Sequence, residues 1–378
     1  MKAEEFRGHF PIFSDGGVHL CSCSEGALSD RVTTALTDFV TSWRIQAAPW
    51  DSWMEQVNEA RTAFAQTIHA DPVDIATVSC ASEAAFQVSW GQSFSATRNV
   101  IITTDLEFPS IAHVWLAQQS RGAIVKFVAN HDGLIMIDDY APFIDDKTAL
   151  VSVPLVSYAN GLRFPVREIA RLAHKMGARV AVDAYQGVGV IPVDVNELEC
   201  DYLFAGTLKY LLGAPGIAFL WVKPGLSHAN DPILTGWFGR QDPFAFTPRI
   251  LDYADSSRRY QTGTPSIPAA FAATAGLSLI NATKTTQVSQ HIERLAEFTQ
   301  AALKGQGWTF FSPNPPFRGP QVTIHAHDAE RISQFLADRR IFVSPRGQAV
   351  RVSLHYYNNE QDIHKLVQAL HDYRRHYP

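Results

Sequence analysis

Residues 179–222, RVAVDAYQGVGVIPVDVNELECDYLFAGTLKYLLGAPGIAFLWV, decide the fold of this chain. They contain two short apolar runs, 179–182 and 202–205, each bounded by polar residues and glycines. Such runs are typical of buried strands. Asp183 directly follows the first run, and Lys209 lies shortly after the second. We therefore predict two buried strands that each lead to a residue with useful chemistry.

A carboxylate at a strand end and a lysine on the loop after a neighbouring strand are the pair that a pyridoxal 5'-phosphate (PLP) enzyme needs. The lysine amine forms a Schiff base with the aldehyde of the cofactor, and the carboxylate keeps the pyridinium nitrogen protonated so that the ring can accept electrons. On spacing alone, Asp183 could instead cap a turn and Lys209 could be a solvated surface lysine, because both residue types are common in loops.

Further motifs surround this pair in a definite order: DAYQ (183–186), PVDV (192–195), DY (201–202), GTLKYLLG (206–213) and PGIAFL (215–220). Their order and spacing resemble the class V aminotransferase family, which includes cysteine desulfurases, kynureninases and isopenicillin N epimerase-like proteins. The resemblance implies that Lys209 is the Schiff-base lysine and that Asp183 is the partner of the pyridine nitrogen. It also implies that Gln186 donates a hydrogen bond to the phenolic oxygen of the cofactor.

Length and composition allow two domains and a large buried core, since the 378 residues are 46% hydrophobic and 18% charged. A formal charge of -5 offers no basic face, so we expect no nucleic-acid partner. Residues 1–13 hold early acids and no apolar run of signal-peptide length, and the apolar stretch 267–280 is too short to span a bilayer. We expect a soluble, cytoplasmic protein without membrane contact.

Four cysteines are scattered along the chain, and their positions are Cys21, Cys23, Cys80 and Cys200. The single residue between the first two is poor zinc spacing, so we expect free thiols and no metal site. No cysteine follows Cys200. The mobile-loop nucleophile of cysteine desulfurases therefore has no counterpart, which removes persulfide transfer by their mechanism.

The strand expected at residues 75–80 leads into a helix expected at 81–88. Such a helix start offers backbone N–H groups and a positive dipole end to a phosphate, although Ser followed by Glu is also an ordinary N-terminal cap. The family has a small-hydroxyl-Glu-Ala turn at this point. By resemblance, Ser82 and the amide of Glu83 hold the phosphate of the cofactor.

Phe108 lies on the loop after the strand expected at residues 99–104. The family places a stacking ring at this position, which is histidine in cysteine desulfurases and phenylalanine in kynureninase-like members. Phe108 could alternatively belong to the core. A phenyl ring stacks but cannot move protons, so its presence argues mildly against acid-base work from this face.

Three other contacts with the cofactor follow from the resemblance. Relatives often have Asn directly after Ser157, where this chain has Tyr158, so either Tyr158 or Asn160 could meet the cofactor. The family commonly has Ser or His just before the lysine, and in this chain Thr207 could supply a hydroxyl to the phosphate. Thr264 lies in a Gly-Thr turn that reaches the phosphate of the neighbouring subunit in dimeric relatives.

The substrate contact that the resemblance implies is Arg351, in the C-terminal stretch 344–358. In the family, this arginine grips the α-carboxylate of the substrate, a bidentate role that suits a guanidinium group. Arg351 could otherwise be a surface residue on a strand, and Arg346 is a second candidate for the contact. We also predict strands near residues 321–324 and 350–353.

Strands and helices alternate along much of the chain, which predicts a mostly parallel sheet that is covered on both faces and binds its ligand at the carboxyl edge. By resemblance, the fold is that of fold-type I PLP enzymes, with a mostly parallel seven-stranded sheet. We predict a large PLP-binding domain over residues 15–257 and a small α/β domain over 258–378, on which residues 1–14 pack.

The favoured function is a PLP-dependent aminotransferase that acts on an amino acid, in a homodimer with shared active sites. The alternatives within the family are a β-eliminating or C–S lyase and an epimerase, because the residues that bind the cofactor are common to all of them. A nucleotide-binding Rossmann protein is disfavoured because no G-x-G-x-x-G turn follows the strand that ends at Cys80. The role of the Gly-, Pro- and aromatic-rich loop 232–249 stays open.

Overall fold

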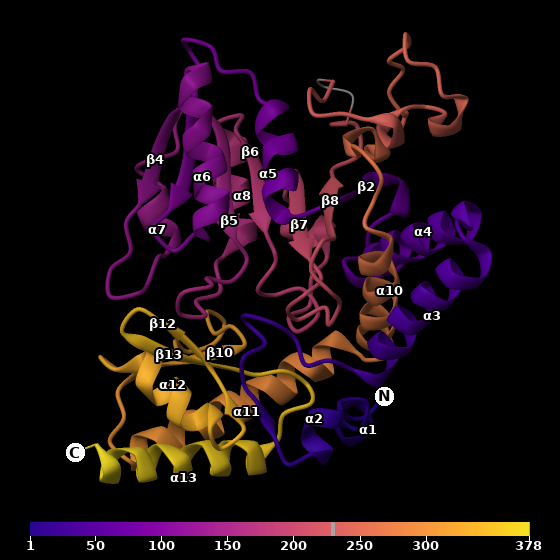
Figure 1. Ribbon diagram of the computed structural model, residues 1–378. Helices are drawn as coiled ribbons and strands as arrows, with labels where there is room; N and C mark the ends of the chain where they lie inside the picture. Colours follow the sequence, from indigo (N-terminus) through magenta and orange to yellow (C-terminus); the bar gives the residue numbers. More distant parts are fainter. Residues whose placement is uncertain (228–230, 378) are drawn as a thin grey trace.

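The structure, a computed structural model, describes residues 1–227 and 231–377. Its centre is a seven-stranded sheet in the order β2-β8-β7-β6-β5-β3-β4 (Figure 1). The strands are β2 (Ile75–Val78), β3 (Val100–Thr104), β4 (Ile124–Val128), β5 (Thr148–Pro154), β6 (Arg179–Asp183), β7 (Tyr202–Gly206) and β8 (Ala218–Val222).

The sheet is mostly parallel, as the sequence predicted. All neighbouring pairs from β7 through β6, β5 and β3 to β4 are parallel, whereas β8 runs antiparallel to both β7 and β2. The loop between β7 and β8 is too short for a crossover helix, so the chain turns back beside the strand it has just left. This loop carries Lys209.

Helices cover both faces of the sheet. Val166, Ile169, Ala170 and Ala173 are buried at helical spacing on α8 (Val166–Lys175), which packs against β5 and β6. The opposite face is covered by α5 (Ala81–Trp90), which packs against β7 and β8, and by α6 (Pro109–Ala117), which packs against α5. Short helices α7 (Ile137–Tyr140) and α9 (Val195–Leu198) complete this part.

A helical layer lies beside β2 (Figure 1). It consists of α3 (Asp30–Gln46), α4 (Trp50–Thr67) and α10 (Ile267–Asn281). The middle helix α10 is apolar on nearly all sides because it packs against both α3 and α4. Single-turn 3-10 helices are η1 (Pro72–Asp74), η2 (Gln118–Arg121), η3 (Trp237–Gly239), η4 (Pro243–Ala245) and η5 (Ser257–Tyr260).

The C-terminal part contains a second, antiparallel sheet in the order β12-β13-β10-β9. Its elements are β9 (Phe310–Phe311), β10 (Gln321–His325), β12 (Ser344–Arg346), β13 (Ala349–Ser353) and the helices α11 (Thr285–Gly305), α12 (Ala329–Ala337) and α13 (Glu360–His376). The small C-terminal α/β unit predicted from the sequence is therefore present. The division into residues 15–257 and 258–378 stays a prediction.

The N-terminal segment lies against this C-terminal part (Figure 1). It forms α1 (Ala3–Gly8), α2 (Pro11–Ser14) and β1 (Val18–His19), and β1 pairs in parallel with β11 (Ile341–Phe342). The ring of Phe6 stacks on His355 with centroids 5.6 Å apart, and the ring of Phe10 lies 4.8 Å from that of Tyr357. Arg7 forms an ion pair of 2.7 Å with Asp362.

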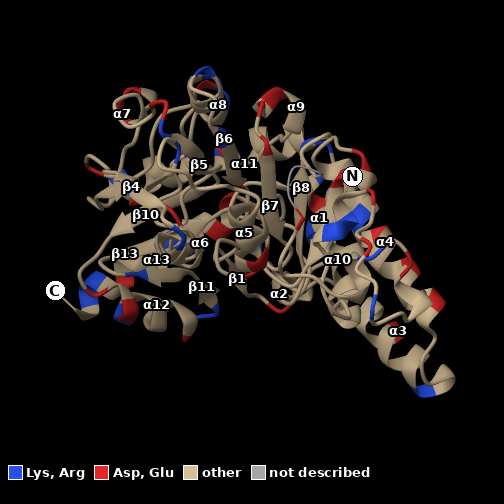
Figure 2. Cartoon of the chain, turned by 90° about the horizontal axis from the view of Figure 1, so that it is seen from above, with Lys and Arg blue, Asp and Glu red and all other residues tan. Residues whose placement is uncertain are grey.

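Acidic and basic side chains are interspersed over the outer helices, as Figure 2 shows for α4 and α8. Within residues 1–227 and 231–377, no helix combines the length and the hydropathy that crossing a bilayer requires.

Candidate active site

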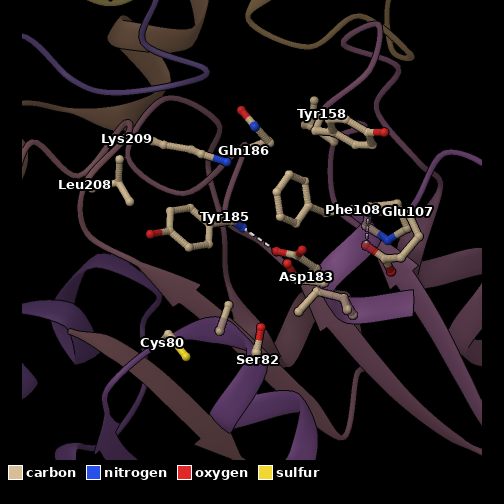
Figure 3. Close-up of a pocket in the computed structure, with 15 residues that line it drawn as sticks. Cys80, Ser82, Glu107, Phe108, Tyr158, Asp183, Tyr185, Gln186, Leu208 and Lys209 are labelled. Carbon is tan, nitrogen blue, oxygen red and sulfur yellow. Dashed lines mark hydrogen bonds between the residues drawn. The ribbon is translucent and has the colours of Figure 1, made fainter. Parts of the chain in front are cut away.

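A cavity of about 220 Å³ lies at the edge of the large sheet where β6 and β7 end (Figure 3). We name it the Lys209 cavity. Parallel strands bring their carboxyl ends to one edge, so the loops after several strands meet here. The lining residues are Cys80, Ala81, Ser82, Glu107, Phe108, Ser110, Ile111, Pro154, Val156, Tyr158, Asp183, Tyr185, Gln186, Leu208 and Lys209.

Lys209 extends its amine into this cavity between two aromatic rings. Its Nζ atom lies 4.5 Å from the centroid of Tyr185 and 5.2 Å from that of Phe108. Burial lowers the pKa of Lys209, while the nearby charge of Asp183 opposes this shift. A buried amine with a lowered pKa is unprotonated near neutral pH more often than a solvated lysine, so it is more readily available as a nucleophile and general base.

Asp183 is the last residue of β6 and lines the same cavity. Its Oδ1 atom accepts a hydrogen bond of 2.9 Å from the backbone N–H of Tyr185. Burial raises the pKa of Asp183, and the hydrogen bond from Tyr185 and the charge on Lys209 act in the opposite direction. A cationic ring nitrogen placed against this carboxylate would hold it in the ionised form.

Glu107 is a second buried carboxylate in the cavity, and sequence analysis did not single it out. It accepts hydrogen bonds from the backbone N–H of Phe108 at 2.9 Å and from the hydroxyl of Ser152 at 3.1 Å. Burial and the negative charge of Asp183 raise its pKa. The signal in the sequence was its place directly before Phe108, in the turn that joins the strand to the following helix.

The N-terminus of α5 forms the lower wall of the cavity (Figure 3). Its first backbone hydrogen bond runs from Ala84 to Cys80, so the amides of residues 81–83 have no carbonyl within the helix. Ser82 lines the cavity there. The carboxylate of Glu83 accepts hydrogen bonds from the backbone N–H of Ser79 at 2.8 Å and from the hydroxyl of Thr262 at 3.0 Å.

Phe108 and Tyr158 form an edge-to-face pair with centroids 5.1 Å apart on one wall of the cavity. Asn160 lies outside it, because its side chain donates to Gly133 O at 2.7 Å and accepts from the N–H of Leu162 at 3.1 Å. Of the two candidates from the sequence, the structure therefore places Tyr158 at the cavity.

Two of the predicted site residues lie elsewhere. The hydroxyl of Thr207 donates to Ala214 O at 2.8 Å, and the residue is fully buried outside the lining. Thr264 lines a separate cavity together with Thr262 and Gly263. Gln186 does line the Lys209 cavity, where its side-chain amide donates to Cys23 O at 3.0 Å.

Arg351 approaches the cavity from β13 and is 1% exposed. One terminal nitrogen donates to Tyr158 O at 2.7 Å and the other to the hydroxyl of Ser24 at 3.2 Å. Its Nε atom is buried without a hydrogen-bond partner in the part of the chain that the structure describes. Since both bonds go to neutral acceptors, the guanidinium charge remains available to an anion.

The residues around the cavity fit PLP. The amine of Lys209 suits the aldehyde, the carboxylate of Asp183 suits the ring nitrogen, and the ring of Phe108 suits the face of the pyridine. The free amides at the start of α5 and the hydroxyl of Ser82 suit the phosphate dianion. The fold and this cavity together define an α/β enzyme of the PLP-dependent class.

Comparison with known proteins defines the family. Residues 28–366 match the aminotransferase class-V family. The chain is 32% identical over 368 residues to YcbU of Bacillus subtilis (strain 168), described as an uncharacterized aminotransferase, with 97% of each chain covered. The chain therefore belongs to the class V aminotransferase family, as the resemblance predicted, and is a PLP-dependent enzyme.

More distant relatives agree on the fold. A cysteine desulfurase of Shigella sonnei (strain Ss046) is 27% identical over 302 residues, covering 75% of this chain and 73% of the relative. The solved structure of a cysteine desulfurase from Thermococcus onnurineus NA1 superposes with a TM-score of 0.86 at 21% identity, covering 98% and 97% of the two chains. A cystine C-S lyase, C-DES, in complex with cysteine persulfide superposes with a TM-score of 0.87 at 23% identity, covering 96% and 99%. The predicted fold-type I architecture is thereby confirmed.

Proposed function

We propose that the protein is an aminotransferase that acts on an amino acid, with Lys209 as its catalytic residue. The observation that carries this proposal is the placement of the Lys209 amine and the Asp183 carboxylate in one buried cavity. When bound, PLP supplies an electron sink for the bonds at the substrate Cα. The chain's own residues then have to hold the reacting groups and move a proton.

Lys209 moves that proton. Its lowered pKa gives a larger fraction of neutral amine near neutral pH than a solvated lysine has. The amine can therefore take a proton from the substrate Cα and return it to another carbon, which is the exchange that transamination requires. Asp183 holds a proton on the ring nitrogen by its opposite charge.

The other predicted residues bind and orient. Phe108 covers one face of the ring, and Ser82 with the amide of Glu83 binds the phosphate at the start of α5. Gln186 contacts the phenolic oxygen with its side-chain amide. Thr207 acts indirectly, because its bond to Ala214 O braces the loop that carries Lys209.

Arg351 binds the α-carboxylate of the substrate. Its buried guanidinium with a free Nε atom supports this role, since two parallel hydrogen bonds to a carboxylate would satisfy it. Arg240, in the loop 232–249, is instead paired with Asp252 at 2.7 Å. Arg346 is exposed on β12 and remains the second candidate.

We further propose a cytoplasmic homodimer in which Thr264 reaches the phosphate site of the second copy. Large apolar side chains support the dimer, because Trp43 and Ile45 on α3 are 59% and 69% exposed and Phe246 is 70% exposed. The loop 232–249, which contains Phe246, would then belong to the interface. Light scattering of the purified protein tests the dimer, and a monomer would contradict it.

A second candidate reaction is β-elimination, including C–S bond cleavage, and epimerisation is a third. We consider β-elimination because a relative of the chain is described as a cysteine desulfurase. The same lysine would take the proton from Cα in all three reactions, so the products distinguish them. An aminotransferase gives a keto acid and transfers nitrogen to a second keto acid, whereas a lyase releases ammonia and an epimerase inverts Cα.

The decisive experiment combines covalent labelling with product analysis. Borohydride should fix PLP onto Lys209, and the Lys209→Ala variant should not be labelled. An amino-acid screen should then give substrate-dependent bleaching of the cofactor band that a keto acid reverses. Labelling of a different lysine would contradict the site, and release of ammonia without nitrogen transfer would contradict the reaction.

A further inference from the structure

Tyr185 lines the Lys209 cavity, yet the roles proposed above leave its hydroxyl unused. It follows Asp183 by two residues, and its backbone N–H is tied to the Asp183 carboxylate. This tie holds the turn after β6, and the side chain reaches sideways over the end of the neighbouring strand β7. Figure 3 shows the ring beside Lys209, with the hydroxyl directed toward the side where Leu208 lies.

Gly206, the last residue of β7, is the residue that the Tyr185 side chain covers. A Cβ atom built on Gly206 would lie 2.2 Å from the phenol oxygen and 2.3 Å from the ring carbon that bears it. Atoms this close cannot coexist, so a side chain at position 206 is excluded while Tyr185 keeps this place. The hydroxyl of Tyr185 therefore occupies the space that a side chain on the last residue of β7 would fill.

The segment just before Lys209 offers the cavity no side-chain donor of its own. Gly206 has no side chain, Leu208 is apolar, and the hydroxyl of Thr207 already donates to Ala214 O. A phosphate dianion needs several donors, and this stretch lies at the same sheet edge as the start of α5. From the turn after β6, the hydroxyl of Tyr185 supplies the donor that the segment 206–208 lacks.

The position of this hydroxyl suits an anion at the start of α5. The helix packs against β7, and its N-cap residue Cys80 and its second residue Ser82 line the same cavity as Tyr185. Burial raises the pKa of Tyr185, as do the charges of Asp183 and Cys80, whereas the backbone N–H of Leu208 lowers it. The phenol therefore stays protonated, and its proton can be donated to an acceptor in the cavity.

We propose that Tyr185 is a further cofactor-binding residue, whose hydroxyl donates a hydrogen bond to the phosphate of PLP beside Ser82. This inference rests on the arrangement of the cofactor proposed above. It predicts a contact with the phosphate rather than with the ring. Removing the hydroxyl should therefore affect PLP and leave pyridoxal, which lacks the phosphate, unaffected.

The test is a spectroscopic titration of cofactor-free protein with PLP and, separately, with pyridoxal. The Tyr185→Phe variant keeps the ring and should bind PLP about tenfold more weakly, the factor expected when a hydrogen bond to a charged group is lost. Its affinity for pyridoxal should equal that of the wild type. Tyr158→Phe is the matched control, because Tyr158 lines the opposite wall, and it should keep the wild-type ratio of the two affinities.

A double variant tests the same contact by moving the hydroxyl group from position 185 to position 206. Tyr185→Ala clears the space over Gly206, and adding Gly206→Ser should restore part of the preference for PLP over pyridoxal. An equal loss of both affinities in Tyr185→Phe, or no loss at all, would overturn the inference. Failure of wild-type protein to attach PLP at Lys209 would instead overturn the proposed site, so the two failures are distinguishable.

Discussion

At the scale of single residues, the chemistry depends on a few buried charges that compensate one another. Burying the ionised carboxylate of Asp183 costs free energy, and its pKa rises for this reason. A cationic group against the carboxylate offsets that cost. Lys209 is costly to bury protonated, so its pKa falls. The fall in the pKa of Lys209 has the sign that a base at Cα requires, whereas Asp183 needs a cationic ring nitrogen against it to stay ionised.

We predict that Asp183→Asn keeps the cofactor but loses most of the turnover. The amide preserves the shape of the carboxylate but cannot stabilise a positive ring nitrogen, so kcat should fall by about 100-fold or more, the order expected when a preorganised charge is removed. Steady-state kinetics and a PLP titration check both parts. Asp146→Asn, an exposed site, serves as the control. Near-normal turnover in Asp183→Asn would show that the electron sink does not depend on this residue.

We also predict that Arg351→Lys weakens substrate binding by about 1.5 to 3 kcal/mol, the range for a hydrogen bond to a charged group. Lysine keeps the charge but gives up the planar fork that binds a carboxylate at two points. Titration with the amino acid, followed through the absorbance of the cofactor, measures the change, and the PLP affinity should stay constant. The exposed Arg346 gives the comparison, and a larger loss in Arg346→Lys would reassign the contact.

At the scale of elements, the site is assembled where a strand ends and the next segment begins. The start of α5 is tied to the turn after η5 through the Glu83 carboxylate, which accepts from the backbone and hydroxyl of Ser79 and from the hydroxyl of Thr262. The tie joins residues 179 positions apart in the sequence. It holds the start of α5 beside the turn that contains Thr264.

We predict that Glu83→Ala loosens this turn. The loss of a charged acceptor should lower the free energy of unfolding by about 1 to 2 kcal/mol, and hydrogen exchange should accelerate in residues 261–266. Urea unfolding and hydrogen exchange measure the two effects. The control is Glu55→Ala on the exposed side of α4, which should leave that turn unchanged. Unchanged exchange in 261–266 would mean that the turn is held by its own backbone.

The strands that carry the site could be predicted because short apolar runs in the sequence indicate buried strands. The apolar runs at 179–182 and 202–205 correspond to β6 and β7, and the residues that follow them meet at one sheet edge for topological reasons. The direction of a hydroxyl is not a local property. Thr207 bonds Ala214, and the phenol of Tyr185 lies over Gly206, because of packing between segments that the sequence pattern does not reveal.

At the scale of the whole molecule, the N-terminal segment and the C-terminal part share one apolar cluster. His19 and His355 are buried there, and His355 bonds Tyr210 O at 3.0 Å and the N–H of Tyr356 at 2.8 Å. The ring of His355 also stacks on that of Tyr357 at 4.6 Å. The cluster therefore joins the first residues of the chain to the loop that carries Lys209.

Because two histidines are buried in this cluster, we predict that the free energy of unfolding falls in mild acid. Burial lowers the pKa of His355 to about 3 and that of His19 to about 4, against 6.5 when unfolded. Both rings stay neutral in the folded protein, whereas the unfolded chain binds protons below 6.5. Their contribution is therefore complete above pH 6.5 and is lost progressively as the pH falls toward the folded pKa values. Between pH 7 and 5, each histidine should lower the free energy of unfolding by about 2 kcal/mol.

The measurement is the urea midpoint of wild-type protein at pH 7 and pH 5, compared with two variants. His355→Gln keeps a donor for Tyr210 O but cannot bind a proton, so its midpoint should depend less steeply on pH, whatever its stability at pH 7. His131→Gln, at a side chain that is 74% exposed, should follow the wild type. Equal pH dependence in His355→Gln and wild type would show that the ring takes up a proton as readily in the folded state as in the unfolded chain, and the apolar cluster would then have to tolerate a buried imidazolium in mild acid.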